Sequence, residues 1–435
     1  MIYRFPPTFW NILLPWKPDN LTMFDNIFRT SLEGLLSAAS VTIDGKNPWD
    51  IRVHDPRLFR KTMLQGNLGF GEAYMDGWWD CNDIEGLFFR ILTAHVDQRL
   101  VTASGVARRL AGALFNLQKP SRSYTVGKRH YDVGNDLFKA MLDPMMIYSC
   151  AYWNGATSLE KAQENKLRLV FDKLGLQPGM KLLDIGCGWG GAARFAAENY
   201  GAKVIGITVS RQQEELARQA CRGHDVEIRF MDYRQLEGTY DRIVSLGMLE
   251  HVGHKNYRTF FETARRNLTP DGRLLVQSIG GNTPSTDGDP WAERYIFPNS
   301  MLPSASQIAT AYEPSFVLED WHSFSYDYTL TLRAWRRNFR HRWPELKHAY
   351  DNRFHRMWDY YLQSFAGAFT ARSIPLWQVL HTPSGIRGEY RVPHEPITRM
   401  ELKGRGNGQA MLPRMPLPDR GLPRESPRSG AGSQS

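Results

Sequence analysis

Residues 181–191 read KLLDIGCGWGG, and this stretch decides the fold of the chain. A short apolar run that contains one acid, Asp184, leads into a glycine-rich turn, and the next residues, 192–197 (AARFAA), have helical character. Glycines allow the backbone to turn sharply and to approach a bound molecule closely, while the first turn of a helix presents unpaired N–H groups. The order strand, tight loop, helix therefore predicts a ligand-binding loop.

The residues around this loop indicate which ligand it binds. Three of its glycines satisfy G-x-G-x-x-G, a spacing that does not by itself choose between ligands. Asp184 stands two residues before Gly186, which is the D-x-G-x-G arrangement of S-adenosylmethionine (SAM) methyltransferases. The next predicted strand, 203–208, ends in Thr208 rather than in the acid that a dinucleotide site places on its ribose. These features favour SAM over a dinucleotide.

Composition limits the remaining classes of protein. At 435 residues, with 42% hydrophobic residues, the chain is expected to hold more than one folded unit. No apolar run approaches the roughly 20 residues that span a bilayer, and the aromatic run 9–16 is too short and too polar for a signal peptide. The cysteines form no C-x-x-C pair, which argues against a metal site or a disulfide framework and fits a reducing cytoplasm. They are Cys81, Cys150, Cys187 and Cys221.

The formal net charge is +9, and the tail from residue 396 supplies +4 of it, from seven Lys/Arg and three Asp/Glu. A basic, aromatic-rich surface can serve nucleic acid or an anionic membrane. In 335–343 arginines alternate with Trp335, Phe339 and Trp343, which also fits a solvated helix face with core aromatics. Since no nucleic-acid motif accompanies this run, the membrane is the better functional alternative.

The first part of the chain is expected to form an extension, 1–22, and a smaller, mainly helical domain, 23–118, that binds lipid or forms an interface. Residues 100–115 read as a basic amphipathic helix. Residues 71–79 (GEAYMDGWW) predict a helix that ends at Gly77, with the tryptophans in the core. An interface or lipid-facing role is the alternative for this stretch.

The main domain is expected over 128–392. Thr157 as N-cap with Glu160 three residues later predicts a helix over 157–174, and the sheet follows over 178–280. The insertion 281–304 is rich in Gly, Pro and aromatic residues, and long loops inside a compact domain are usually functional.

The remainder of the chain is expected to complete the sheet. A short strand at 316–318 is followed by two helices that reach about Arg372 and by a closing strand at 376–380. The tail 396–435 holds six prolines and six glycines and is expected to be disordered. The predicted fold class is α/β, a doubly wound SAM-methyltransferase sheet with a smaller helical N-terminal domain.

Several motifs together resemble one known family. Between about Ile27 and Val392 the chain is similar to cyclopropane-fatty-acyl-phospholipid synthases, bacterial SAM-dependent enzymes related to the mycolic acid cyclopropane synthases. The motifs that carry this resemblance are 71–79, 130–138, 148–153, 183–191, 249–257, 295–299 and 376–379. The resemblance implies addition of a methylene from SAM across a cis double bond of unsaturated phospholipid acyl chains.

The resemblance also implies a mechanism. The methyl of SAM is activated by its sulfonium, so the π electrons of an aligned alkene in a dry site can attack it. Attack leaves a carbocation, and a base must then take a proton from the transferred methyl so that the ring closes. The family implies bound bicarbonate as that base, and the negative faces of aromatic side chains suit a transient cation.

By the same resemblance, the bicarbonate pocket is formed by Cys150 (mainly through its backbone), Glu250, the backbone of Ile279, and Tyr328. Glu250 would accept the bicarbonate hydroxyl, and Tyr328 would donate to its oxygens. From the residues alone, Glu250 could instead be a helix-capping acid and Tyr328 a core side chain. Where the family usually has a histidine, this chain has Gln277, whose amide can hydrogen-bond but cannot titrate. Slow ring closure could then favour a methyl-branched or methylenated chain.

For SAM the resemblance implies contacts along the whole molecule, with Cys187 as a small filler of the loop rather than a nucleophile. The predicted cofactor residues are Tyr148 and Ser149 at the methionine end, Asp184, Gly186 and Gly188 in the loop motif, Thr208 and Gln213 near the ribose, and Asp232 with Tyr233 at the adenine.

The sequence therefore predicts a cytoplasmic enzyme, peripheral on the inner face of a bacterial membrane, that takes unsaturated phospholipids and uses SAM and bicarbonate. Trp291, Ile296 and Phe297 are expected to help admit the acyl chain. No metal and no nucleic-acid partner is expected, and a homodimer is one expectation for the assembly. The alternatives are a related SAM-dependent lipid methyltransferase with a different product, and a lipid-binding relative without turnover.

Overall fold

The computed structural model describes residues 18–99, 134–388 and 390–396, with side chains from residue 26 onward. These residues belong to one compact unit that ends at Pro396. Several predictions lie outside the described residues. They concern most of the extension 1–22, the basic helix 100–115, residues 130–133, and the tail beyond residue 396.

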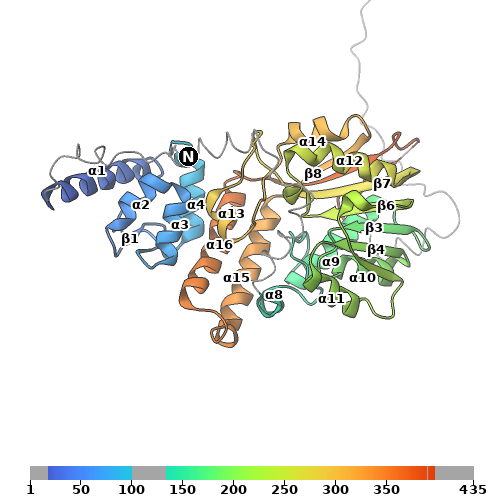
Figure 1. The fold of residues 1–435 in the computed structure, drawn as a ribbon, viewed down its shortest axis with the longest axis horizontal. Coiled ribbons are helices and arrows are strands. Elements are labelled where there is room, and N and C mark those ends of the chain that lie inside the picture. The colour runs from blue at the N-terminus through green and yellow to red at the C-terminus, as the bar shows by residue number, and fades with distance from the viewer. Residues whose placement is uncertain (1–17, 100–133, 389, 397–435) are drawn as a thin grey trace, which may run out of the picture. The chain divides into compact units, whose positions relative to one another are not determined.

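A seven-stranded sheet carries the second half of the fold (Figure 1). Its strands are β3 (Lys181–Ile185), β4 (Lys203–Thr208), β5 (Val226–Phe230), β6 (Tyr240–Leu246), β7 (Leu268–Ile279), β8 (Val317–Ser323) and β9 (Leu376–Thr382). The order across the sheet is β5-β4-β3-β6-β7-β9-β8. The first five strands in this order are parallel, and β9 runs antiparallel to both of its neighbours.

The sheet is covered on both faces because successive residues of a strand point to opposite sides. Leu182 and Leu275 pack with helices α9 (Leu159–Leu174) and α10 (Gly191–Tyr200) in one core. Their neighbours Leu183 and Leu274 pack in a second core with α12 (Tyr257–Arg266) and α14 (Ala305–Tyr312). Helix α11 (Arg211–Ala220) packs beside β4 and β5. The predicted doubly wound α/β fold class is confirmed.

Two local predictions at the sheet are wrong. Helix α9 is capped by Ser158, whose hydroxyl accepts from the backbone N–H of Lys161 at 3.2 Å, and not by Thr157. The strand predicted at 316–318 runs on to Ser323 because it pairs with β9, so β8 and not β9 closes the sheet. All seven residues of β9 are buried, as suits a central strand, whereas Val317 of β8 is exposed.

The insertion 281–304 is not entirely loop, because it contains helix α13 (Pro290–Tyr295). Asp289 caps this helix by accepting from the backbone N–H of Ala292 at 2.8 Å, and Pro290 occupies its first turn. Both residues are common helix-start signals, so the helix could have been read from the sequence.

The N-terminal part is mainly helical. It consists of α1 (Pro18–Ser37), α2 (Arg57–Gln65), α3 (Asn67–Met75), α4 (Ile84–Thr93), α5 (Val96–Arg99) and the small antiparallel pair β1 (Arg52–Val53) and β2 (Trp79–Asp80). As predicted, helix α3 stops before Gly77, which has φ +75°. Trp79 is fully buried, but Trp78 is only partly buried, and the charges of Arg57 and Lys61 lie over its ring.

Two long helices connect the N-terminal helices with the sheet. They are α15 (Tyr326–Leu346) and α16 (Asn352–Thr370), as predicted; α16 packs on α3 and α4, and α15 packs on α8 (Asn135–Met141) (Figure 1). Trp335 and Phe339 are fully buried, and Arg336 pairs with Asp359 at 2.7 Å. These aromatic residues are therefore core residues. Among the helices that the structure describes, none is long and apolar enough to cross a membrane.

Candidate active site

The glycine-rich loop joins β3 to α10 at the carboxyl ends of the parallel strands, where ligands of open α/β sheets bind. Gly186 and Gly188 have φ values of +86° and +55°, which favour glycine. A Cβ on Gly186 would also lie 3.1 Å from the side chain of Met248. The loop therefore needs glycine for its conformation and, at Gly186, for space.

Asp184 lies at the end of β3, directly before this loop. Its carboxylate is buried, and Oδ2 has no hydrogen-bond partner among the described residues. Burial raises the pKa of Asp184 to about 7, and the charge of Lys166 acts in the opposite direction. A buried polar atom without a partner is costly, so an added donor at Oδ2 would be favoured.

Lys166 is a functional candidate that sequence reasoning missed. Its side chain is fully buried on α9, and its Nζ donates to Ser149 Oγ at 3.2 Å. Burial lowers the pKa of Lys166 to about 8, while Asp143 and Asp184 favour its charged form. A lysine among buried positions of a predicted helix was the only signal for it in the sequence.

Tyr148, predicted at the methionine end of SAM, lies in an aromatic cluster. Its hydroxyl is 2.9 Å from that of Tyr361, and its ring centroid is 5.1 Å from those of Phe138 and Trp335. Phe297 of the insertion stacks at 6.3 Å. The sequence did not indicate Tyr361, because α16 meets Tyr148 only in the folded chain.

Thr208 and Gln213, predicted near the ribose, are brought together. Thr208 lies at the end of β4, and its hydroxyl donates to Gln213 Oε1 at 2.9 Å. Ser210 caps α11 by accepting from the backbone N–H of Gln213 at 3.3 Å. Strand end and helix start thus hold both polar side chains on the same edge of the sheet as the glycine loop.

The two residues predicted at the adenine differ in environment. Asp232 follows β5 and caps the short helix η1 (Tyr233–Gln235), while the guanidinium of Arg234 donates to both of its oxygens, at 2.8 and 2.9 Å. The ring of Tyr233 instead packs in the core against Phe260 of α12, with centroids 5.6 Å apart. The Tyr233 side chain is therefore engaged in the core, which leaves its backbone for the predicted role.

The buried thiols are not poised for nucleophilic chemistry. Burial raises the pKa of Cys150 and of Cys187 well above the usual value, which keeps both protonated. The Cys150 thiol donates to the carbonyl of Ala151 at 3.1 Å. Thr331 of α15 accepts from the backbone N–H of Ala151 at 3.1 Å and from the indole of Trp153 at 3.0 Å, so it fixes this segment.

Glu250 is the most perturbed acid at the other side of the strand ends. It lies in the short helix η2 (Leu249–His251), and its Oε1 accepts from the backbone N–H of Ile279, the last residue of β7, at 2.6 Å. Its Oε2 is buried and has no hydrogen-bond partner within the described part of the chain. Burial raises the pKa of Glu250 to about 7, and the Ile279 N–H partly offsets this. The carboxylate is thus not a helix cap.

Tyr328 lies near Glu250 and Cys150, whose charges would both disfavour its ionisation. Its ring stacks on Phe369 with centroids 4.4 Å apart, and burial raises the pKa of the phenol well above 10. A phenol that stays protonated can donate a hydrogen bond to an anion.

Gln277 is held by a second amide. It lies on β7 opposite Gln378 of β9, and Gln378 Nε2 donates to Gln277 Oε1 at 3.0 Å. Both side chains are buried, and Gln378 Oε1 has no partner among the residues described. Neither amide can take up or release a proton near neutral pH.

These residues form two neighbouring parts of one edge of the sheet. The first part, around Gly186 and Asp184, offers backbone N–H groups and a buried carboxylate. The second part offers a buried carboxylate with one vacant oxygen, Glu250, and a protonated phenol, Tyr328. Over residues 18–99, 134–388 and 390–396, no group of His, Cys, Asp and Glu side chains is placed to hold a metal ion.

Comparison with known proteins identifies relatives along most of the chain. The family model described as mycolic acid cyclopropane synthetase matches residues 118–379. The cyclopropane-fatty-acyl-phospholipid synthase of Escherichia coli K12 is 50% identical over 369 residues, which cover 85% of this chain and 96% of that protein. The tuberculostearic acid methyltransferase of Mycobacterium tuberculosis is 34% identical, over 75% of this chain and 81% of that protein.

A solved structure agrees with these relatives. A mycolic acid cyclopropane synthase complexed with SAH and CTAB superposes with a TM-score of 0.56 and 31% identity, covering 59% of this chain and 97% of that one. The family match spans more than half of the sequence, and one relative is half identical over most of it. The chain therefore belongs to the mycolic acid cyclopropane synthetase family.

Proposed function

We propose that this protein transfers a methylene from SAM to cis double bonds of unsaturated phospholipid acyl chains, forming cyclopropane fatty acids. The observation that carries the proposal is the buried carboxylate of Glu250, which has one oxygen fixed by Ile279 and the other without a partner. It lies near Tyr328 and at the same sheet edge as the glycine loop. The identity to the Escherichia coli synthase over 85% of the chain supports the same reaction.

SAM supplies an electrophilic methyl group when it is bound. The vacant oxygen of buried Asp184 suits a cationic donor such as an ammonium group, and Gly186 and Gly188 let the backbone come close to the ligand. Thr208 with Gln213 offers polar groups to a ribose, and Asp232 with the Tyr233 backbone offers them to an adenine. Tyr148 and Ser149 would orient the methionine end.

Bicarbonate is the base that we propose for the deprotonation step. Glu250 Oε2 would accept a hydroxyl from this anion, Tyr328 would donate to it, and the backbone N–H of Cys150 would complete the pocket. The raised pKa of Glu250 lets this group hold a proton near neutral pH, which removes the charge repulsion between the carboxylate and the anion. A nucleophile is absent from this arrangement, since the nearby thiol of Cys150 stays protonated.

We propose that the enzyme acts peripherally at the inner face of the membrane, where its lipid substrate lies. The CTAB in the related synthase structure is a long-chain cation, which supports an acyl-chain pocket in this fold. Trp291, Ile296 and Phe297 of the insertion are the residues that we assign to admission of the acyl chain. A homodimer stays a prediction.

The test is the lipid product after incubation of the purified protein with SAM and vesicles of unsaturated phosphatidylethanolamine. A mass gain of one CH2 with upfield ring-proton NMR signals is expected. Fully saturated vesicles serve as the control, because they offer no alkene. SAM binding without any product would contradict the proposal and favour a lipid-binding relative without turnover.

Gln277 supports a second candidate function, a methyl-branched or methylenated product. Its amide cannot titrate, and Gln378 already occupies its carbonyl oxygen, so it assists proton removal less than an imidazole would. The related tuberculostearic acid methyltransferase is named for a different modification. The same product analysis separates the two candidates, because the mass gain is shared and only the ring signals differ.

A further inference from the structure

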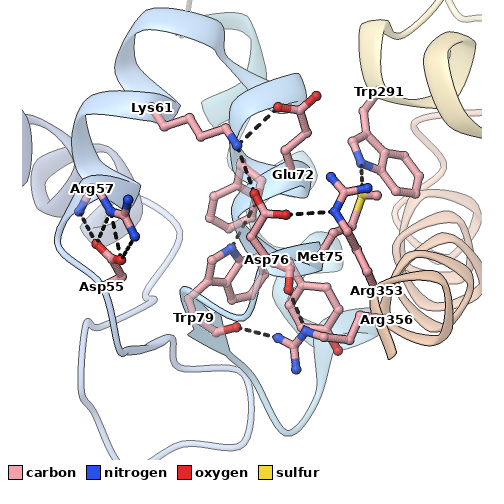
Figure 2. A network of polar contacts seen from close by, with 12 residues as sticks. Asp55, Arg57, Lys61, Glu72, Met75, Asp76, Trp79, Trp291, Arg353 and Arg356 are labelled. Atoms are coloured by element: carbon pink, nitrogen blue, oxygen red, sulfur yellow. Dashed lines mark hydrogen bonds and ion pairs between the residues drawn. The ribbon is translucent and has the colours of Figure 1, made fainter. Parts of the chain in front are cut away.

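Helix α13 of the insertion rests directly on the backbone of helix α3. Trp291 of α13 is 1% exposed, and a Cβ on Gly71 of α3 would lie 2.5 Å from its Cδ1 atom. Gly71 has ordinary helical backbone and no positive φ, so glycine is present there for space and not for conformation. The indole Nε1 also lies 3.4 Å from Met75 Sδ on the same helix (Figure 2).

Polar contacts anchor both ends of α13 to the N-terminal helices. At its C-terminal end, Glu72 of α3 accepts from the Tyr295 hydroxyl at 2.8 Å and pairs with Arg294 at 3.1 Å. At its N-terminal end, Asn67 donates to the capping residue Asp289 at 2.5 Å. Lys61 of α2 lies 3.2 Å from the second oxygen of Glu72 and neutralises it (Figure 2).

The residues after α13 lead into the site. Phe297 follows the helix by two positions, and its ring lies 6.3 Å from Tyr148 and 5.7 Å from Tyr361. The backbone N–H of Met301 donates to the carbonyl of Glu250 at 2.9 Å. A shift of α13 would therefore move the aromatic residue that contacts Tyr148.

We infer that the Gly71–Trp291 contact, together with the Glu72 cluster, makes helix α3 a positioning element for the acyl-chain wall of the active site. In this inference, which rests on the proposed function, the N-terminal helices do more than meet lipid. They set where α13, and through it Phe297, stand beside the bound acyl chain. Gly71, Glu72 and Trp291 are positioning residues, because they act on the substrate through α13.

The alternative is that these contacts merely hold the N-terminal helices in place. Arg356 of α16 tests this, because it ties the same helices to the rest of the fold without touching α13. It donates to Asp80 at 2.7 Å and to the carbonyl of Trp79 at 2.8 Å (Figure 2). Asp80→Asn weakens this attachment and leaves the α3–α13 contact intact.

The experiment compares Gly71→Ala with Gly34→Ala in the full chain. Both replace a helical glycine of the N-terminal part, but a Cβ on Gly34 meets nothing within 4 Å. We expect Gly71→Ala to lower kcat/KM for unsaturated phospholipid roughly tenfold or more, since small misplacement near a reacting group has large effects. The Kd for SAM should stay within about twofold. Gly34→Ala and Asp80→Asn should behave like the unchanged protein.

Two further measurements keep the inference testable if Gly71→Ala folds poorly. Tyr295→Phe removes only the hydroxyl that Glu72 accepts, and it should lower kcat/KM for lipid in the same direction. Hydrogen exchange across 290–297 should be faster in Gly71→Ala and in Tyr295→Phe than in Gly34→Ala, whether or not the protein turns over. Trp291→Leu in the Gly71→Ala background should restore part of the lost kcat/KM by making room for the methyl.

Three outcomes would overturn the inference. Gly71→Ala could match Gly34→Ala in both kcat/KM and exchange, Asp80→Asn could lose as much kcat/KM as Gly71→Ala, or the loss could appear in SAM affinity instead. Failure of the proposed function itself is recognised differently, because the unchanged protein would then form no cyclopropane product while the exchange comparison still reports on α13.

Discussion

At the scale of single residues, burial is the dominant influence on the site. Asp184 and Glu250 are two carboxylates at the strand ends, both buried, each with one oxygen that lacks a partner, and both with a pKa raised to about 7. An unpartnered buried carboxylate costs stability, so its presence indicates a binding role. The two acids divide the work that we propose, with Asp184 at SAM and Glu250 at bicarbonate.

Glu250→Gln is expected to abolish turnover while leaving SAM affinity unchanged. The amide keeps an acceptor for the Ile279 N–H, but it presents an amide group to the anion in place of the carboxyl. Product formation from SAM and unsaturated vesicles, together with calorimetry of SAM binding, measures both effects. Full activity in this variant would contradict the assigned role.

The same variant is expected to change the pH dependence of stability. The pKa of Glu250 is about 7 in the folded protein against an ordinary 4.5, so the folded form holds the proton more tightly. As pH rises from 4.5 to 7 the unfolded chain ionises first, and the unchanged protein loses stability. The free energy of unfolding of Glu250→Gln, relative to the unchanged protein, should rise by about 2 kcal/mol between pH 5 and 8. Denaturant unfolding at both pH values measures it, and a constant difference would refute it.

Asp184 is expected to make SAM binding pH-dependent. Its raised pKa of about 7 leaves it partly protonated near neutral pH, whereas a cationic donor needs the carboxylate. The Kd for SAM should therefore weaken by about tenfold per pH unit below pH 7. Asp184→Asn should bind SAM weakly with a flat profile, and methylthioadenosine, which lacks the ammonium group, should show a flat profile with the unchanged protein. A flat SAM profile in the unchanged protein would exclude this role.

At the scale of elements, the positions of helix and strand ends decide which side chains meet. Helix α9 illustrates this, because it carries Lys166 to Ser149 and covers one face of the sheet. Its N-cap is Ser158 and not Thr157, although both residues are good caps. Leu159 is 3% exposed, and seating this side chain in the core sets which of the two adjacent hydroxyls faces the helix.

Ser158→Ala is therefore expected to lower the free energy of unfolding by about 1 kcal/mol, because it removes the acceptor for the Lys161 N–H. Thr157→Ala is the matched control and should change it by less than about 0.5 kcal/mol. Urea unfolding of the two variants gives the comparison. Equal losses at both positions would show that the cap is shared.

At the scale of the whole molecule, segments that are distant in sequence close the fold. Residues 390–396 return to the sheet, where the Tyr390 hydroxyl donates to the carbonyl of Lys173 at 2.9 Å. His394 lies 2.8 Å from Asp320, whose other oxygen pairs with the buried Lys173. The Tyr152 hydroxyl donates to the His394 carbonyl at 2.8 Å, next to the segment that carries Cys150.

A chain that ends after Gly388 is expected to melt at a lower temperature than one that ends after Pro396. Loss of the Tyr390 and His394 contacts should cost on the order of 2 kcal/mol, since Asp320 keeps only one of its two partners. Both chains lack the residues beyond 396, so the comparison isolates the returning segment. Thermal unfolding monitored by circular dichroism measures it, and equal melting temperatures would show that the segment contributes nothing.

The sequence by itself determined the α/β fold, the glycine loop with Asp184, the two long helices, and the family to which the chain belongs. These features depend on local patterns, in which alternation, glycine spacing and helical periodicity act over a few residues. The roles of Glu250 and Tyr328 came from the resemblance and not from any local pattern, because the two residues lie on separate elements.

Tertiary structure alone decided the cap of α9, the place of β8 at the sheet edge, the burial of Lys166, the Gln277–Gln378 pair and the seat of α13 on α3. The physical reason is common to all of them. Each depends on which face of an element becomes buried against a partner that is distant in the chain, and that choice minimises the free energy of the whole core rather than of any local segment.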